Sequence, residues 1–477
     1  MNRFLKYLLL VASLCTALIS CEKDEVTPTI SLSQRSIILS ELGESATVTY
    51  SGAHIDNISS SSAPDGWSLN ISGGVIHISA PTEQQDFERS YNATKVTITV
   101  KSKDDRTASA TLSLGTTNNT IDLTPVMANS FVISKAHTVY SLSATTAGTS
   151  GESIAPKSAK LLWQTANSPI SMVRLNGDKI NFYTPNDVDD LNENGAISDV
   201  VEGNALIGLL DSNGQVLWSY HLWITNYSPD KETISLNGAT VMNRNLGASN
   251  NANDTEEEIL SSYGMYYQWG RKDPFPAPNS YNAAYGTDAT LYNEFGYSVK
   301  IKYEESTPAT GSTLYATAYP TTYITGVEES SYDWLYADHS QSLWSDTKSI
   351  NDPCPYGWRV ASQETFDDMK LPTLSQEDID LLANSYGWEL TNGSTTTLFM
   401  GLGRRGQITG RIQNVNTNEH RPAPWVGYYW SNSATTENNS NALYFAYDNE
   451  NINDCTIENA KSSYRATGMQ IRCQKIE

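Results

Sequence analysis

Basic residues are scarce in this chain, and their scarcity excludes one large class of partner. The 477 residues include 31 lysines and arginines against 53 aspartates and glutamates, which gives a formal net charge of −22. A protein that binds nucleic acid needs clustered lysine and arginine to neutralise phosphates. The same acidity favours solubility and disfavours binding to an anionic surface. We therefore expect no nucleic acid among the partners of this protein.

Long apolar runs are also lacking. One apolar run covers residues 7–19, and it is shorter than the about 20 residues that a membrane-spanning helix needs. No later segment approaches that length. The sequence therefore predicts no membrane-spanning helix.

The motifs of common catalytic sites are missing as well. The sequence contains no His-Glu-x-x-His, Gly-x-Ser-x-Gly, phosphate-binding Walker loop or Cys-x-x-Cys. The carboxylates are too numerous to be paired for acid–base work from sequence. The six histidines have no spacing typical of metal ligands: His54, His77, His137, His221, His339 and His420. We predict that the protein is not an enzyme and carries no cofactor.

The N-terminus has the pattern of a secreted lipoprotein. A short basic stretch precedes the apolar run, which has the length of a signal-peptide core and ends in Ile19, Ser20 and Cys21. Small residues before a cysteine resemble the lipobox of bacterial lipoproteins. The resemblance implies a signal peptide over residues 1–21 and lipidation of Cys21. An ordinary secretory signal with a chance cysteine is the alternative.

The residues that follow Cys21 indicate where the protein is displayed. Residues 22–25 are a lysine and three acids, and they resemble the export signal of surface lipoproteins in Bacteroidetes. The alternative is the solvated start of a linker, which we assign to residues 22–28. The resemblance implies a protein of the outer membrane that is anchored by lipid and exposed on the cell surface.

Two β-domains are predicted next. Residues 29–115 alternate apolar and polar positions in short runs, and Gly73 with Gly74 is a hairpin signal, which together predict an immunoglobulin-like β-sandwich spacer. Residues 120–240 contain further apolar runs, including a long strand at 215–224. This second β-sandwich resembles a segment of fimbrillin-associated surface proteins in Bacteroidetes.

The last predicted domain covers residues 241–477. Its aromatic, glycine and cysteine motifs lie at residues 263–275, 352–360, 427–431, 441–445 and 468–473. In order and spacing they resemble the Fibrobacter succinogenes major paralogous domain, a relative of C-type lectin-like and formylglycine-generating-enzyme-like folds. The predicted fold class is therefore mainly β and multidomain, with two N-terminal β-sandwiches followed by an α+β C-type lectin-like domain.

Local patterns inside this domain predict two helices and a loop region. Ser362 can cap a short helix that runs through Met369, and residues 375–386 have the apolar stripe of a second helix, with Gly387 at its end. Residues 275–330 are rich in Tyr, Thr, Ala and Gly and are predicted to be long loops.

Three cysteines remain after the leader and the lipidation site, so two can pair and one is spare. The resemblance implies a disulfide between Cys354 and Cys473, and Cys455 is a competing partner. A bridge between Cys354 and Cys473 would close a loop of about 120 residues and stabilise the fold by roughly 4–5 kcal/mol.

Three further motifs resemble binding sites but lack part of the pattern that such a site needs. Asp190, Asn192 and Asn194 form half of a calcium loop, but the twelfth position holds no glutamate, so a surface turn is favoured over calcium. Residues 401–406 match a dinucleotide fingerprint with no helix after it and are predicted to be a β-turn. Residues 430–432 lack the partner triplet of a sugar-binding C-type lectin.

We predict a cell-surface adhesin or binding protein that recognises a glycan or a host protein through its C-terminal domain, and a pilus-tip subunit is one concrete form of this prediction. The alternatives are a glycan-capture lipoprotein of a polysaccharide uptake system and a structural pilus component without a ligand. The candidate ligand-binding residues are aromatic: Tyr266, Tyr267, Trp269, Trp334, Trp344, Trp425, Tyr428 and Tyr429. Trp358 and Trp430 belong to the family motifs and are predicted to be structural.

Overall fold

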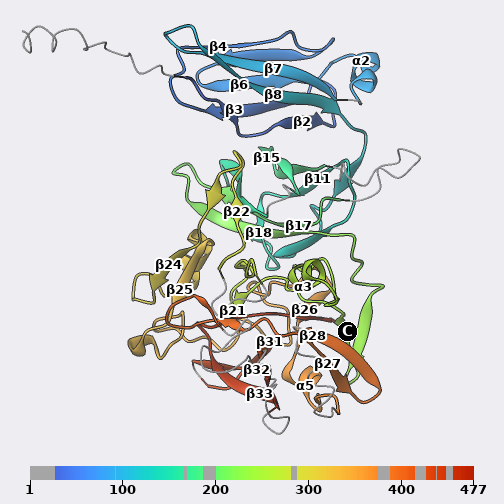
Figure 1. The fold of residues 1–477 in the computed structure, drawn as a ribbon, viewed down its shortest axis with the longest axis vertical. Helices are drawn as coiled ribbons and strands as arrows, with labels where there is room; N and C mark the ends of the chain where they lie inside the picture. The colour runs from blue at the N-terminus through green and yellow to red at the C-terminus, as the bar shows by residue number, and fades with distance from the viewer. Residues whose placement is uncertain are drawn as a thin grey trace, which may run out of the picture. The chain divides into compact units, whose positions relative to one another are not determined.

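The computed structural model shows a mainly β chain that divides into two compact units (Figure 1). The first unit combines residues 1–35 and 42–115, and the second combines residues 36–41 and 116–477. The structure describes residues 27–91, 93–165, 169–185, 200–280, 287–373, 387–413, 426–436, 438–446 and 455–477.

Among its described residues, the first unit contains two antiparallel sheets and one short helix. One sheet has the strand order β1-β3-β6-β5, and the other contains β8, β7 and β4 as neighbours. The elements are β1 (Ser31–Leu32), β3 (Ser45–Ser51), β4 (Asn57–Ser60), β5 (Ser68–Ser72), β6 (Val75–Ser79), α2 (Gln84–Arg89), β7 (Thr94–Lys101) and β8 (Thr107–Thr116).

Period-two alternation builds the core of this unit. In β7, Val96, Ile98 and Val100 are fully buried while their neighbours face outward, because successive side chains of a strand point to opposite faces. Gly73 and Gly74 connect β5 to β6 as a two-residue turn with φ of 59° and 81°. Both angles are positive, as a primed hairpin turn requires, so the predicted hairpin is confirmed.

The second unit holds the remaining elements. Its strands before residue 240 are β2 (Ser36–Leu39), β9 (Thr120–Asp122), β10 (Ser130–Ile133), β11 (Thr138–Ser143), β12 (Thr146–Ala147), β13 (Glu152–Ser153), β14 (Ser158–Gln164), β15 (Ser171–Asn176), β16 (Lys179–Thr184), β17 (Gly203–Leu210), β18 (Val216–Ile224) and β19 (Thr233–Leu236).

The later strands of this unit are β20 (Ala239–Met242), β21 (Tyr267–Gln268), β22 (Leu291–Tyr292), β23 (Ser298–Val299), β24 (Lys302–Glu305), β25 (Thr322–Thr325), β26 (Trp358–Val360), β27 (Gly387–Asn392), β28 (Thr395–Met400), β29 (Arg404–Arg405), β30 (Ile412–Gln413), β31 (Val426–Ala434), β32 (Asn439–Ala446), β33 (Thr456–Tyr464), β34 (Gly468–Met469) and β35 (Cys473–Lys475). The helices are α3 (Glu256–Ser261), α4 (Thr313–Ala318), the 3₁₀ helix η1 (Glu328–Ser330) and α5 (Gln363–Phe366).

The largest sheet of the second unit has the order β10-β18-β17-β14-β22-β23. Its central strands β17 and β18 are buried along most of their length, because the sheet packs on both faces. One hydrophobic cluster lies on it together with β11 and β16, and includes Tyr140, Phe182 and Leu222. The strand predicted at 215–224 is confirmed as β18.

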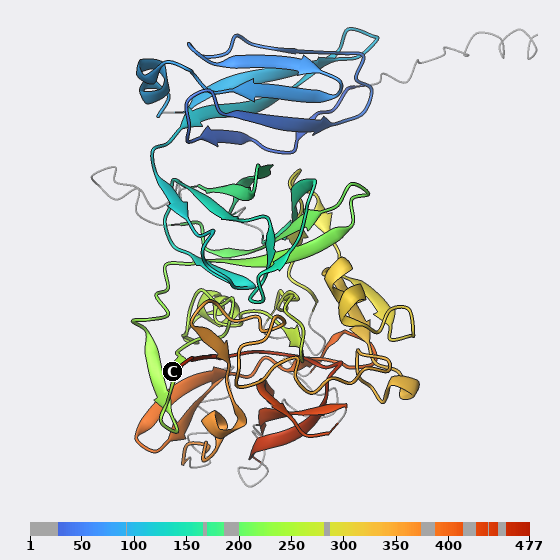
Figure 2. The same ribbon diagram turned by 180° about the vertical axis from the view of Figure 1, so that it is seen from behind.

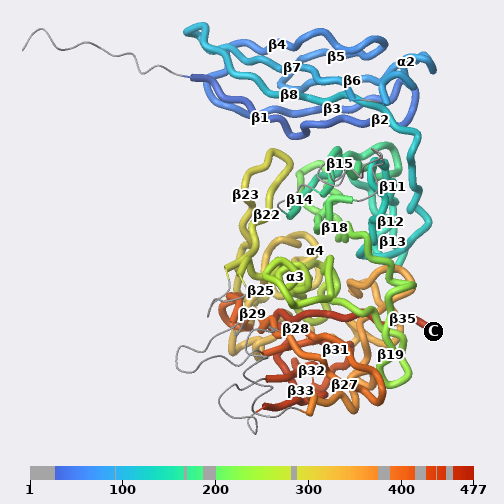
Figure 3. The backbone as a smooth tube through the Cα atoms, turned by 45° about the vertical axis from the view of Figure 1, so that its right-hand side comes forward, coloured from blue at the N-terminus to red at the C-terminus, as the bar shows by residue number. Residues whose placement is uncertain are grey.

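The second hydrophobic cluster extends from Trp163 to Cys473 and spans the predicted boundary at 240 and 241. Strand β22 lies beyond that boundary in sequence, yet it pairs with β14 through Tyr292 and Gln164 (Figure 3). Strand β35, at the C-terminus, pairs with β20 and β26 (Figure 2). Residues 116–477 are thus one compact unit with two hydrophobic clusters.

Two local predictions meet different outcomes. Ser362 is the N-cap of α5, but this helix stops at Phe366 and is shorter than expected. The prediction of long loops over residues 275–330 is wrong for a good part of that stretch, whose described residues include β22, β23, β24, α4, β25 and η1. Ser312 caps α4 by accepting a hydrogen bond from Tyr315 N, a signal present in the sequence. The helix predicted at 375–386 lies outside the described residues.

Candidate functional site

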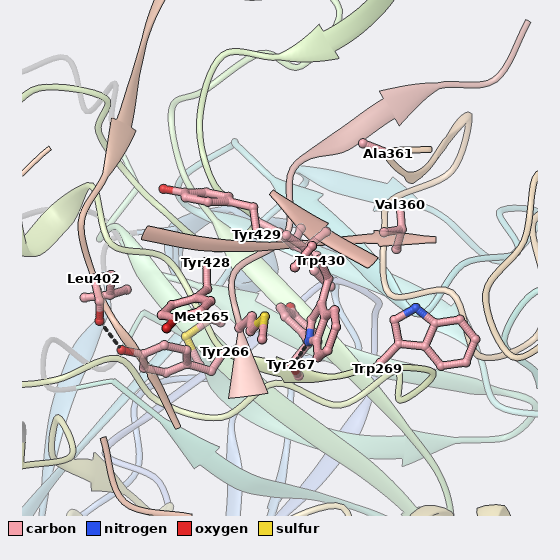
Figure 4. Close-up of a cluster of buried hydrophobic side chains, with 14 of the residues drawn as sticks. Met265, Tyr266, Tyr267, Trp269, Val360, Ala361, Leu402, Tyr428, Tyr429 and Trp430 are labelled. Carbon is pink, nitrogen blue, oxygen red and sulfur yellow. Dashed lines mark hydrogen bonds between the residues drawn. The ribbon is translucent and has the colours of Figure 1, made fainter. Parts of the chain in front are cut away.

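Seven of the eight aromatic residues predicted to bind a ligand are core residues. Their exposed fractions range from 0% to 5%: Tyr266, Tyr267, Trp269, Trp334, Trp344, Tyr428 and Tyr429. Figure 4 draws Tyr266, Tyr267, Trp269, Tyr428 and Tyr429 in a cluster of buried side chains. A ring that is packed on both faces has no surface for a ligand. We therefore correct the assignment of these residues from ligand binding to the hydrophobic core. The eighth, Trp425, lies outside the described residues.

Internal hydrogen bonds explain how these polar-edged rings can be buried. Tyr266 donates to the carbonyl of Leu402 over 2.7 Å, and Trp430 donates to the carbonyl of Tyr267 over 3.0 Å (Figure 4). Burial raises the pKa of Tyr266 because the phenolate loses its hydration. Trp358 and Trp430, which were predicted to be structural, are also buried.

The other predicted sites have mixed outcomes. The structure contains the disulfide that the family resemblance implied, between Cys354 and Cys473, and Cys455 is half-buried. The lipidation candidate Cys21 lies outside the described residues. So do the calcium candidates Asp190, Asn192 and Asn194.

The prediction of a β-turn at residues 401–406 is wrong for Arg404 and Arg405, which form β29, while residues 401–403 connect β28 to β29. Gly403 has a φ of 65° and lies between β28 and β29. Within the part of the chain that is described, no group of three or more His, Cys, Asp and Glu side chains could hold a metal ion. No described helix is long and apolar enough to cross a membrane.

Buried arginines hold the loops of the second unit in place, and the sequence did not reveal this role. Arg405 is fully buried and forms a 2.6 Å ion pair with Asp288, and the same guanidinium donates to the carbonyl of Pro276. Arg472 is also fully buried and donates to Asn245 and Thr397. Burial lowers the pKa of Arg472 to about 10, which leaves it charged at neutral pH.

Arg465 joins the loop at residues 339–340 to the hairpin of β31 and β32. Its guanidinium donates to four backbone carbonyl oxygens and to one hydroxyl group: His339 O, Ser340 O, Thr436 O, Asn439 O and Ser440 Oγ. The guanidinium also lies 4.3 Å from the centre of the Trp269 ring. Arginine suits this position because its planar group presents five donors in a fixed geometry.

A buried carboxylate supports the same loops. Asp333 is fully buried and lies 3.7 Å from Arg465. It accepts hydrogen bonds from Leu335 N and from the ring of His339 over 3.0 Å. Burial raises the pKa of this carboxyl group, while the bonds to His339 and Leu335 oppose the rise. The result is one fixed surface built from segments around residues 331, 339, 438 and 465.

Two partly exposed tyrosines lie on this surface. The rings of Tyr332 and Tyr464 are 5.0 Å apart between centres, and Tyr464 is 39% exposed. Asn438 donates to the carbonyl of Ser331, and Asn439 donates to the hydroxyl of Ser462. Sequence reasoning missed these residues because β33 and the turn after η1 are 130 residues apart. No local signal in the sequence marks Tyr464 as a neighbour of Tyr332, since only the folded chain brings the two rings together.

Comparison with known proteins identifies no family for the chain. No protein-family model matches it, and no curated protein does. Solved structures that match include a chimeric titin Z1Z2, with 16% identity over 19% of this chain and 95% of that chain, at a TM-score of 0.15. The N-terminal Ig1-2 module of the Drosophila receptor protein tyrosine phosphatase DLAR matches with 12% identity over 42% of this chain and 99% of that one, at 0.16. A protocadherin gammaB7 fragment, EC3-6, matches with 13% identity over 42% and 50%, also at 0.16. Similarities this low carry no argument, so function has to be argued from the chain itself.

Proposed function

We propose that this chain is a lipid-anchored binding protein of the cell surface, of the adhesin type, that recognises a glycan or a host protein through its second unit. The observation that carries the proposal is the loop surface fixed by Arg465. One buried guanidinium joins four backbone carbonyls of two segments, the loop at residues 339–340 and the hairpin of β31 and β32, and a buried carboxylate supports it. Loops held on a rigid β-scaffold are the usual place for recognition.

The proposed compartment rests on the cysteines and on the leader. Disulfides form and persist in oxidising environments, and Cys354 with Cys473 forms one in the second unit. Cys21 follows a signal-like run in the sequence. Together these features support a secreted protein held at a membrane by acyl chains, which contribute roughly 0.8 kcal/mol per buried CH₂.

The proposed architecture keeps the first unit as an immunoglobulin-like spacer and gives the second unit a β-sandwich part and a C-type lectin-like part. The pairing of β20 with β35 supports the lectin-like part, because it places the start and the end of residues 239–477 side by side in one sheet. The disulfide supports it as well, since it attaches the segment before β26 to β35.

The test of binding uses the chain from Glu22 onward, which keeps every described residue. It is applied to arrays of glycans and of matrix proteins, with heat-denatured protein as the control. We expect selective binding that denaturation abolishes. Binding to nothing on either array would overturn the proposal and favour the structural pilus component.

The test of anchoring uses Cys21→Ser in the complete chain. We expect the unsubstituted chain to incorporate labelled fatty acid and to be digested by protease on intact cells. The variant should incorporate none and leave the membrane fraction. Equal labelling of the two would contradict an anchor at Cys21.

A further inference from the structure

The backbone beneath Tyr332 adopts a conformation that side chains seldom accept. Ser331 and Tyr332 are consecutive and have φ of 52° and 59°. A positive φ of this kind costs a residue other than glycine of order 1 kcal/mol, so such a conformation is kept only where the surrounding structure enforces it. Such strain gathers at sites of function, so this turn is a place to look for one.

Hydrogen bonds on both sides enforce the turn. Tyr332 N donates to the carbonyl of Val327 over 2.8 Å, and Ala466 N donates to the carbonyl of Tyr332 over 3.3 Å. Gly326 packs so closely on Tyr332 that a Cβ would collide with its backbone. The chain therefore holds Tyr332 at a fixed place against the end of β33.

The fixed turn brings two aromatic rings together at the surface. The Tyr332 and Tyr464 ring planes meet at 58° with their centres 5.0 Å apart. Tyrosine offers an apolar face and a polar edge, and it loses little conformational entropy on binding because it has only two χ angles. A pair of such rings is suited to a ligand that has both apolar C–H faces and hydroxyl groups.

Amide and hydroxyl groups surround the rings. Asn439 is the cross-strand partner of Tyr464, and its amide donates to Ser462 over 3.1 Å. The hydroxyl of Thr436 donates to the side-chain oxygen of Asn438 over 3.0 Å. Asparagine and serine side chains can both donate and accept hydrogen bonds. Such groups can orient a polar ligand without carrying a charge.

The charges of this surface disfavour an anionic ligand. Arg465 directly follows Tyr464 in the sequence, and its donors are directed to backbone carbonyls and Ser440. It is also fully buried. Glu328 and Glu329 of η1 come just before the strained turn in sequence and are acidic. A carboxylated or sulfated ligand would therefore meet these acids, and the buried guanidinium of Arg465 is not available to pair with it.

We propose that Tyr332 and Tyr464, with the side chains of Asn438, Asn439 and Ser462, bind a neutral sugar unit of a glycan. The inference rests on the proposed binding function and names both its site and the chemical class of its ligand. The sugar stacks a C–H face on the tyrosine rings while its hydroxyls exchange hydrogen bonds with the amides. No metal ion takes part.

The experiment measures binding of the chain from Glu22 onward to neutral oligosaccharides that end in glucose, galactose, mannose or N-acetylglucosamine. Sialylated and sulfated oligosaccharides and matrix proteins are probed beside them. We expect binding to a neutral member. Tyr464→Ala and Tyr332→Ala should each weaken it about tenfold or more, as truncation of a central aromatic contact does. Tyr464→Phe keeps the ring and should stay within about threefold of the unsubstituted chain.

The matched control is Tyr356→Ala, since Tyr356 is a tyrosine of the same unit that is 66% exposed and lies in a turn before β26. It should leave binding unchanged, and thermal unfolding should show that all variants are folded. Neutral-sugar binding that survives both Tyr332→Ala and Tyr464→Ala would overturn the site but leave the proposed function standing. Binding to matrix proteins alone, or to anionic glycans alone, would overturn the sugar class. Binding to no probe at all would overturn the site and the proposed function together.

Discussion

Single residues show the limit of reading function from composition. Tyrosine and tryptophan suit both a hydrated binding surface and a hydrophobic core. The sequence does not show whether the hydroxyl or ring N–H bonds to solvent, to a ligand or to another part of the chain. The structure resolves the ambiguity through carbonyl acceptors such as Leu402 O, which satisfies the hydroxyl of Tyr266 inside the core. A polar group with an internal partner can be buried at little cost. Arg465 is the reverse case, because arginine is mostly exposed and only its carbonyl partners make burial tolerable.

His221 makes a testable contribution to pH dependence at this scale. It is 1% exposed, with its ring 2.8 Å from Asn204 Oδ1 and 3.1 Å from the hydroxyl of Ser130. Burial lowers its pKa from 6.5 to about 3. The pKa of His221 is lower in the folded chain than in the unfolded chain. Its contribution to the unfolding free energy is therefore complete above pH 6.5 and is lost as the pH falls from 6.5 toward 3. We expect the second unit to lose about 2 kcal/mol of unfolding free energy on moving from about pH 7.5 to about pH 5 on account of this group.

The measurement is urea unfolding at both pH values, compared with His221→Gln, which cannot titrate. The variant starts less stable, so the informative quantity is the difference between the two pH values rather than either value. Other groups, including Asp333, whose raised pKa acts in the opposite direction, contribute equally to both proteins and cancel. An identical pH difference in the two proteins would refute the assignment to His221.

At the scale of elements, local sequence signals were sufficient to predict strands but insufficient to predict which strands pair with one another. The turn at Gly73 and Gly74 and the long strand β18 were predictable, because period and turn chemistry are local properties. The parallel pairing of β10 with β18 and the addition of β22 to β14 were not, since they join segments about 90 and 130 residues apart. The strained turn at Tyr332 belongs to the same class, because Ala466 and Asn438 enforce it from far along the chain.

Close packing between β31 and β32 gives a prediction about one strand pair. Gly427 lies directly opposite Phe445, and a Cβ at Gly427 would overlap the Phe445 ring. Overpacking of this kind costs about 1–3 kcal/mol. Gly427→Ala should therefore destabilise the second unit by about that amount in urea unfolding. Adding Phe445→Leu makes room, so the double variant should lose less than the sum of the two single losses.

A contrasting glycine separates steric overlap from backbone strain. Gly74 has a φ of 81°, and a Cβ there would meet nothing within 4 Å. Gly74→Ala should cost about 1 kcal/mol of unfolding free energy through backbone conformation alone, and the loss should appear in the first unit.

The double variant decides the cause of the loss at Gly427. If the unfolding free energies lost by Gly427→Ala and Phe445→Leu were additive, the loss at Gly427 would have to come from something other than contact with the Phe445 ring.

At the scale of the whole molecule, the two units are stabilised by different kinds of interaction. The first unit consists of alternating strands around small apolar residues, and its residues 27–35 and 42–115 include no cysteine. The second unit contains the buried arginines and the disulfide, which joins residues 119 positions apart. Sequence composition predicted a mainly β chain with several parts. It could not show that residues 120–240 and 241–477 share one compact unit, because contacts such as β22 with β14 decide that.

Removal of the disulfide should therefore affect one unit alone. Cys354→Ala with Cys473→Ala leaves two small apolar side chains at positions that are fully buried, so the main loss is the loop constraint on the unfolded chain. For a loop of this length that constraint is worth roughly 4–5 kcal/mol. We expect calorimetry to show a lower unfolding temperature for the second unit and an unchanged one for the first. A matched fall in both transitions would mean that the units unfold as one cooperative system, and a fall in neither would mean that buried contacts such as those of Arg465 stabilise the second unit without the bridge.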